Sequence, residues 1–364
     1  MDDGARATGD VEPLRARGPR RSPWGRRPAR TPDGRGAGER VGAPTYAALD
    51  LGTNNCRLLI ARPTSDGFRV VDAFSRIVRL GEGVSGSGRL AEPAIARALA
   101  ALTICRDKIH NRAVARTRLI ATEACRAAEN GPDFIAAVER QLGLRLDIID
   151  RETEARLAAT GCTPLIDPAV NRAILFDIGG GSSELVHLGA QSNGAGPPRP
   201  VIHEWVSLPL GVVTLAEKHG GLRVDPPLFE TMVEEVRSHL GSFAAAHANG
   251  AGRFHLLGTS GTVTTIAGVH LKLRRYDRRY VDGCWMNSGE IDAVIQTLLG
   301  MSYEQRVANA CIGAERADLV LAGCAILEAI RRAFPCNRLR VADRGLREGM
   351  LVEMMRHDGV WAGG

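Results

Sequence analysis

Two acidic residues flank a run of glycines in the stretch AILFDIGGGSSELVHL, residues 173–188. Three consecutive glycines, 179–181, can turn with exposed N–H groups because they lack Cβ atoms and tolerate positive φ. Such a turn forms a concave site for an anion such as phosphate. Asp177 precedes the turn and Glu184 follows it, and one or two carboxylates commonly hold Mg²⁺ together with phosphate oxygens. The stretch therefore predicts a phosphate and magnesium site, with a glycine-rich turn between solvated acids as the alternative.

The same pattern occurs a second time, earlier in the chain and without a gap. When the stretch TYAALDLGTNNCRLLIA, residues 45–61, is set under the first one, Asp50 aligns with Asp177. The glycine, polar and apolar positions after Asp50 keep the same offset, and Arg57 stands where the later stretch has Glu184. Both stretches have the pattern of a buried strand, a tight turn and a second strand. Two such loops predict an internal duplication in which they face each other across a cleft.

Length and charge limit the class of protein. The chain has 364 residues, 44% of them apolar, which is enough for a sizeable core and about two domains. Residues 1–40 hold ten arginines and six acids, so only +2 of the total charge of +6 belongs to the rest. The body is therefore nearly neutral, and we expect no specific nucleic-acid partner. Residues 1–43 are rich in Arg, Gly and Pro and are expected to be disordered. Such a basic segment could contact RNA or another polyanion, or it could have no role.

The cysteines and the apolar pattern bear on the compartment. None of the eight cysteines forms a C-x-x-C pair, and several lie in apolar segments, which predicts reduced thiols in a cytoplasmic protein. No apolar run is long enough to cross a bilayer, and residues 1–30 lack an apolar segment altogether. Neither a membrane span nor a secretory signal is therefore expected. The spacing of histidine and cysteine does not suit zinc.

Hydrophobic periodicity predicts strands and helices that alternate in both halves of the chain. Helices are expected at 92–109, 132–142, from 150 onward, and at 214–219, 229–246, 290–299, 317–333 and 345–356; strands at 68–74, 117–121, 144–149, 201–208, 255–257 and 339–342, besides the two hairpins. Thr122 and Asp150 are placed to cap the helices that follow them. The predicted class is α/β, with domains at 44–166 and 167–364 and the last helix packing back on the first domain.

Seven segments, spread over residues 46–356, carry a family resemblance. In chain order they are DLGTNNCRLLIA, ETEARL, DIGGGSSELV, SLPLGVV, GTSGTVTTIA, RAD-x₃-AG and DRGLREGML. Together they resemble the Ppx/GppA phosphatases, which are exopolyphosphatases and guanosine pentaphosphate phosphohydrolases of the actin/sugar kinase/Hsp70 (ASKHA) superfamily. The resemblance implies two RNase H-like domains with an active-site cleft between them. Long members append an HD-like helical region, and this chain is expected to be too short to contain one.

The resemblance also implies roles for individual residues. Glu154 would activate water, and Asp177 and Glu184 would hold Mg²⁺; from its position alone, Glu154 would be a solvated residue in the first turn of a helix. Phosphate contacts are implied for Asp50, Gly52, Thr53, Asn54, Asn55 and Arg57 in the first loop and for Gly179, Gly180, Gly181, Ser182 and Ser183 in the second. Further substrate contacts are implied for Arg76 and Arg79, before the segment LGEG, and for Gly258, Ser260, Gly261 and Thr262 in a strand-to-helix turn.

Two positions depart from the family pattern. The first loop has Thr-Asn-Asn at residues 53–55 where the family commonly has Ser-Asn-Ser, so an amide replaces one hydroxyl and still offers a donor. Glu123 stands where the family often has a small or polar residue. A carboxylate there would either assist a metal or oppose a polyanion. The three arginines 57, 76 and 79 could equally be solvated surface residues.

The leading hypothesis for function is a Mg²⁺-dependent exopolyphosphatase, which releases terminal phosphate from inorganic polyphosphate. The closest rival is the same hydrolysis on pppGpp, giving ppGpp, because both substrates are linear polyanions with a terminal phosphate. An ATP-dependent sugar or acid kinase would use the same loops but needs an acceptor pocket and an adenine site, which the sequence does not indicate. A non-catalytic alarmone-binding regulator is a further alternative, although the carboxylates needed for catalysis are present. Family membership also implies a homodimer.

Overall fold

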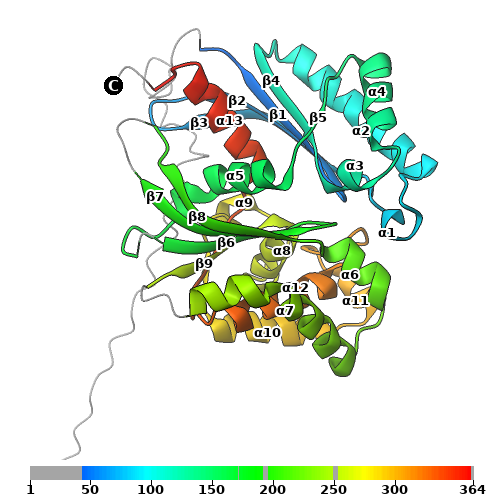
Figure 1. Ribbon diagram of the computed structural model, residues 1–364, viewed down its shortest axis with the longest axis vertical. Coiled ribbons are helices and arrows are strands. Elements are labelled where there is room, and N and C mark those ends of the chain that lie inside the picture. Colours follow the sequence, from blue (N-terminus) through cyan, green and yellow to red (C-terminus); the bar gives the residue numbers. More distant parts are fainter. Residues whose placement is uncertain (1–42, 171, 192–195, 249–252, 362–364) are drawn as a thin grey trace, which may run out of the picture.

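The computed structural model describes residues 43–170, 172–191, 196–248 and 253–361. Figure 1 shows two lobes, each built on a sheet with helices packed on it. The predicted disordered extension, residues 1–43, lies outside the described residues except for its last member. Within the described ranges, no helix is both long and apolar enough to cross a membrane.

The first lobe contains a five-stranded sheet with strand order β3-β2-β1-β4-β5. Its strands are β1 (Tyr46–Leu51), β2 (Asn55–Pro63), β3 (Phe68–Ile77), β4 (Arg116–Ala121) and β5 (Asp147–Ile148). The first three form antiparallel pairs, and β4 and β5 continue from β1 in parallel. The outer face is covered by α2 (Glu92–Asn111) and α4 (Gly131–Leu142), and the short helices are α1 (Val84–Ser87) and α3 (Glu123–Ala127).

The second lobe contains a six-stranded sheet with strand order β10-β11-β9-β6-β7-β8. Its strands are β6 (Arg172–Ile178), β7 (Ser183–Gln191), β8 (Arg199–Leu208), β9 (His255–Thr259), β10 (Trp285–Met286) and β11 (Leu339–Val341). Its helices are α6 (Val212–His219), α7 (Pro226–Ala248), α8 (Ser260–His270), α9 (Arg278–Val281), α10 (Ser288–Gly300), α11 (Tyr303–Ala308) and α12 (Val320–Ala333). Most of them cover the outer face of this sheet (Figure 1).

Two helices, α5 (Arg151–Cys162) and α13 (Leu346–His357), lie between the two sheets (Figure 1). Their apolar side chains share one core with the inner faces of both sheets, including Ala48 of β1 and Leu175 of β6. The helices approach so closely that a Cβ atom added at Gly349 would lie 2.0 Å from the carbonyl oxygen of Leu157. Only a residue without a side chain fits this crossing. Helix α13 contacts β1 and α5. The predicted domains, with their boundary at 166 just after the 3-10 turn Thr163–Leu165 and the last helix packing back on the first domain, stay a prediction.

The predicted duplication is visible in the backbone. In the first hairpin Asp50 pairs with Arg57, and in the second Asp177 pairs with Glu184 at the same register. Each turn is closed by the same hydrogen bond at 2.9 Å, from Gly52 N to the Asn55 carbonyl and between the corresponding atoms of the second turn. The strand order outward from each hairpin is also the same. The predicted α/β class with two sheet-based halves is therefore confirmed.

The two predicted helix caps have different outcomes. Asp150 caps α5, because its side chain accepts a 2.7 Å hydrogen bond from the Thr153 N–H. Thr122 occupies the N-cap position of α3, but its side chain accepts no capping hydrogen bond, so that prediction was wrong. Its backbone lies outside the extended conformation that side-chain capping requires, with φ −119° and ψ −142°.

Candidate active site

The two glycine turns face each other across a cleft of about 570 Å³. At one point the two turns touch, because a Cβ atom added at Gly180 of the second turn would lie only 2.9 Å from Cβ of Thr53 in the first turn. The predicted site residues that line the cleft are Asp50, Gly52, Thr53, Asn54, Asn55, Arg57, Glu154, Asp177, Gly179, Gly180, Gly181, Ser182, Glu184, Ser260, Gly261 and Thr262. Tertiary folding therefore brings together residues from widely separated parts of the sequence.

Three carboxylates of the two hairpins, Asp50, Asp177 and Glu184, lie in this cleft. Burial and the charge of Asp50 raise the pKa of Asp177 to about 6, against the opposing effect of Arg57. Burial and the charge of Asp177 raise the pKa of Glu184 to about 7, although Ser207 donates a 2.9 Å hydrogen bond to it. The pKa of Asp50 is also raised, chiefly by burial. Burial and the repulsion between these carboxylates thus raise their pKa values more than the nearby arginines lower them.

This crowding fits a divalent cation. Asp177 and Glu184 are direct partners across β6 and β7, so both side chains project from the same face of the sheet. A cation between them would relieve the repulsion that raises their pKa. Among the described residues, no group of three or more His, Cys, Asp and Glu side chains is arranged to hold a metal by itself. Mg²⁺ does not need such a cage, since water and phosphate oxygens complete its shell.

Glu154 lies in the first turn of α5 and faces the two loops. Burial, and then the charges of Glu184, Asp50 and Asp177, raise its pKa well above the usual range. Nη2 of Arg126 holds one of its carboxylate oxygens at 3.1 Å. Arg126 was not among the predicted site residues, although it belongs to the TEACR segment that begins α3.

Glu123 is neutralised by two arginines. It accepts hydrogen bonds from Arg126, at 2.9 Å from Nε, and from Arg151, at 2.8 Å from Nη2. The carboxylate is therefore part of an ion-pair cluster that fixes Arg126 beside Glu154. The sequence left two roles open for Glu123, assisting a metal or opposing a polyanion. Its two ion pairs favour a third role, in which Glu123 orients Arg126.

Cationic side chains also line the cleft, close to these carboxylates. Arg57 is joined there by Arg316 and by Arg347 of α13, neither of which the sequence singled out. Burial lowers the pKa of both Arg316 and Arg347, and the charge of Arg57 lowers it further. Within the described ranges, neither Arg57 nor Arg347 forms an ion pair or a side-chain hydrogen bond. Arginines that repel one another in a cleft and lack a hydrogen-bonded acidic partner are suited to bind an anion.

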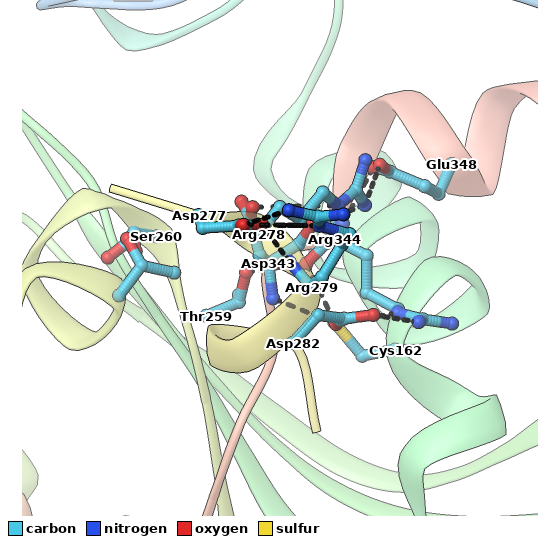
Figure 2. Close-up of polar contacts among 12 residues, drawn as sticks. Cys162, Thr259, Ser260, Asp277, Arg278, Arg279, Asp282, Asp343, Arg344 and Glu348 are labelled. Atoms are coloured by element: carbon cyan, nitrogen blue, oxygen red, sulfur yellow. Dashed lines mark hydrogen bonds and ion pairs between the residues drawn. The ribbon is translucent and has the colours of Figure 1, made fainter. Parts of the chain in front are cut away.

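A network of ion pairs and hydrogen bonds holds the segment that leads into α13, including Asp343, Arg344 and Glu348 (Figure 2). Arg278 of α9 donates to the Asp343 carbonyl and, at 2.9 Å, to Glu348. Glu348 in turn accepts a 3.0 Å hydrogen bond from Gly345 N and so caps α13. Arg344 is paired with Asp282, and its carbonyl accepts a 2.6 Å hydrogen bond from Thr259. The DRGLREG segment is thereby fixed beside Asp177.

Several polar groups in the cleft have no partner. The side-chain oxygens of Asn54, Asn55 and Ser260 are buried and make no hydrogen bond within the described ranges. Ser260, at the start of α8, also has a φ of +94°, a strained conformation for a residue with a side chain. Unpaired buried polar groups and backbone strain are both features of ligand-binding sites.

Four predicted contacts are not supported by their positions. Ser183 is fully buried and donates to the Leu210 carbonyl at 2.7 Å. Gly258 lies in β9, where a Cβ would be 2.6 Å from the ring of Phe176, so it serves packing. Arg79 forms a bidentate ion pair with Asp318 of the second lobe, with both distances 2.9 Å. Arg76 is exposed and lies in an adjoining groove of about 340 Å³, which it shares with Arg316.

The fold and the site together define a class of protein: a two-lobed α/β enzyme with two glycine-rich turns, acidic residues and a candidate base in an interlobe cleft. The sequence model of the Ppx/GppA phosphatase family matches residues 59–358. The chain belongs to the Ppx/GppA phosphatase family, which confirms the predicted resemblance, and it is a phosphoanhydride hydrolase of that family.

Individual relatives agree with this assignment. Exopolyphosphatase 2 of Mycobacterium tuberculosis is 31% identical over 327 residues, which cover 85% of this chain and 98% of the relative. A guanosine-5'-triphosphate,3'-diphosphate pyrophosphatase of Photobacterium profundum is 26% identical, and the match covers 86% of this chain but only 60% of the longer relative. The crystal structure of the Aquifex aeolicus PPX-GPPA enzyme is 30% identical with a TM-score of 0.70, covering 85% of this chain and 99% of that one.

Proposed function

We propose that this chain is an exopolyphosphatase, which hydrolyses the terminal phosphoanhydride bond of inorganic polyphosphate and releases orthophosphate. The observation that carries the proposal is the position of Glu154, held by Arg126 and facing two phosphate-binding turns across one cleft. The match with Exopolyphosphatase 2 of M. tuberculosis over 98% of that relative's length supports polyphosphate as the substrate.

The terminal phosphate binds between the two turns in this proposal. Backbone N–H groups of the two glycine turns line that position and donate hydrogen bonds to the phosphate oxygens. The groups are already in place in the folded chain, so they stabilise the charge that develops in the reaction without having to reorganise.

Glu154 acts as the base. Burial and the neighbouring carboxylates raise its pKa, which makes it a stronger proton acceptor than an exposed glutamate, and Arg126 fixes its orientation. As a water oxygen attacks the terminal phosphorus, one water proton passes to a carboxylate oxygen of Glu154 and the bond to the bridging oxygen breaks. The shortened chain leaves with the additional negative charge, which faces Arg57 and Arg347.

Magnesium is the proposed cofactor. Asp177 and Glu184 would hold it, with Asp50 nearby. When bound, Mg²⁺ neutralises charge on the phosphate oxygens and so makes the phosphorus accessible to attack. The Ser207 hydroxyl keeps the Glu184 carboxylate in position from the neighbouring strand.

Hydrolysis of pppGpp to ppGpp is the second candidate. The cleft extends beyond the phosphate turns past Ser260 and Thr262 to Tyr276, which leaves space for a nucleoside. The relative from P. profundum is named for this kind of substrate. No comparable observation supports a sugar or acid kinase, and the complete set of carboxylates argues against a non-catalytic regulator.

We also propose a cytoplasmic location, because all eight cysteines are free thiols. A homodimer remains a family-level prediction.

The test is a phosphate-release assay on long-chain polyphosphate and on pppGpp, with Mg²⁺. We expect turnover of polyphosphate and a loss of about 10²–10⁴-fold in kcat for Glu154→Gln, the usual contribution of a general base. Glu152→Gln is the matched control, because Glu152 is exposed in the same helical turn. Equal inertness of the wild type toward both substrates, or an unchanged kcat in Glu154→Gln, would refute the proposal.

A further inference from the structure

A strongly basic segment runs along the rim of the cleft in the second lobe. Residues 270–280, HLKLRRYDRRY, contain five lysines and arginines and one acid, a net charge of +4 within a short segment. By comparison, residues 41–364 together have a net charge of only +2. The segment links α8 to α9, so it follows a helix that begins in the cleft.

Two of the five cations are neutralised. Arg278 binds the Asp343 carbonyl and Glu348, and Arg279 forms hydrogen bonds of 3.0 and 2.6 Å with Asp277 (Figure 2). The other three are Lys272, Arg274 and Arg275, here called the basic rim. Each is exposed, and in the part of the chain that the structure describes none of the three forms a hydrogen bond or an ion pair through its side chain.

The basic rim is held in a defined place. The N–H groups of Lys272 and Leu273 donate to the carbonyls of Val269 and Gly268, at 3.0 and 3.1 Å, which fixes the turn after α8. The thiol of Cys311 donates to the Leu273 carbonyl from a neighbouring loop. The three cations are therefore presented by an ordered turn.

The basic rim is continuous with the cleft. Tyr276 and Arg278 line the cleft, and Arg275 directly precedes Tyr276. The Cα atom of Arg274 lies at most ~7.6 Å from that of Tyr276, since consecutive Cα atoms are ~3.8 Å apart. Lys272 follows the end of α8, an eleven-residue helix whose length is ~16 Å from its start in the cleft. The three cations thus lie on the segment that leads directly to Tyr276 and Arg278 in the lining of the cleft.

We propose that the basic rim binds the distal part of a long polyphosphate chain whose terminal phosphate lies in the cleft. This inference rests on the proposed exopolyphosphatase function and assigns a second contact region to it. A linear polyanion carries a negative charge on every unit, so it can occupy the cleft and the rim at once. The few phosphates of a nucleotide are already bound in the cleft. Exposed cations without partners attract a polyanion strongly at low salt and weakly at high salt.

The test compares the triple variant Lys272→Gln, Arg274→Gln, Arg275→Gln with the wild type on long-chain polyphosphate and on tripolyphosphate. We expect KM for the long chain to rise about tenfold while kcat is unchanged, and both constants for tripolyphosphate to stay within about twofold. The slope of log(1/KM) against log[salt] for the long chain should decrease by about 2, at ~0.7 per lost contact. The control is Arg140→Gln, Arg172→Gln, Arg223→Gln, which removes the same charge from exposed positions outside the cleft.

Each outcome decides the inference. An unchanged KM for long chains in the triple variant overturns it and leaves the exopolyphosphatase proposal intact, whereas a wild type inert on polyphosphate overturns both. An equal rise in KM for tripolyphosphate also overturns it, because the rim would then act on the cleft itself. Loss of single-stranded RNA binding in the triple variant, with long-chain KM unchanged, would identify the rim as an RNA site and refute the inference.

Discussion

Replacing Asp177 with asparagine is expected to stabilise the metal-free protein at pH 8 while it abolishes activity. Burial and the nearby Asp50 charge raise the pKa of Asp177 from 3.8 to about 6. The folded state therefore keeps a proton on this carboxylate at pH values where the unfolded chain has released it. The contribution of Asp177 to stability is fully present below its unfolded pKa and is lost as the pH rises through about 6.

The size of the effect follows from the pKa. A rise of about two units corresponds to ~3 kcal/mol at pH 8, since one unit is ~1.4 kcal/mol. Water at the mouth of the cleft screens part of this cost, so we expect Asp177→Asn to raise the free energy of unfolding by about 2 kcal/mol. Near pH 4 most of the difference should vanish, because the aspartate is then protonated in the folded state and about half protonated in the unfolded chain.

The assay is urea denaturation in the presence of a chelator at pH 4 and pH 8. Asp147→Asn serves as control, because Asp147 is exposed in β5 and, within the described ranges, forms no ion pair. Adding MgCl₂ at pH 8 should stabilise the wild type and have little effect on Asp177→Asn. A variant no more stable than the wild type at pH 8, or a gain of the same size at pH 4, would contradict the reasoning.

Three further predictions test other parts of the site. Phosphate release should increase as the pH rises through 6 to 7, where the pKa values of Asp177 and Glu184 lie, and its midpoint should move to lower pH as magnesium is added; a flat profile from pH 5 to 8 would count against this. Gly349→Ala should lower the free energy of unfolding by about 3 kcal/mol in urea denaturation, whereas Gly300→Ala, where a Cβ meets nothing within 4 Å, should not. Arg126→Gln should lower kcat at least about tenfold with little change in KM, and an effect on KM alone would argue against its role beside Glu154.

Much of the fold was predictable because it follows from local patterns in the sequence. The constant offset between the two glycine turns predicted a duplication, and both hairpins have the same register, Asp50 with Arg57 and Asp177 with Glu184. Alternating strands and helices predicted two α/β halves. These features depend on neighbours along the chain, whose chemistry the sequence shows directly.

The candidate site was predictable only in part, and the misses share a physical cause. Arg126, Arg316 and Arg347 were missed because each meets charged groups that are remote in sequence: Arg126 meets Glu154, Arg316 meets Arg57, and Arg347 meets Asp50. Arg79 was expected at the substrate because arginines bind polyanions, but the approach of the two lobes gives it Asp318 as a partner instead. Ser183 follows a phosphate-binding turn, yet the alternation of side chains along β7 turns it into the core.

The sequence by itself determined which family the chain belongs to, because its glycine turns, acidic residues and later motifs follow one another in the order of that family. Only the tertiary structure decided which charges meet. Packing α5 and α13 between two sheets places Glu154 beside Arg126 and brings Arg347 near Asp50. The physical reason is that charge interactions depend on distance and burial, and both are set by contacts between segments that the chain keeps far apart.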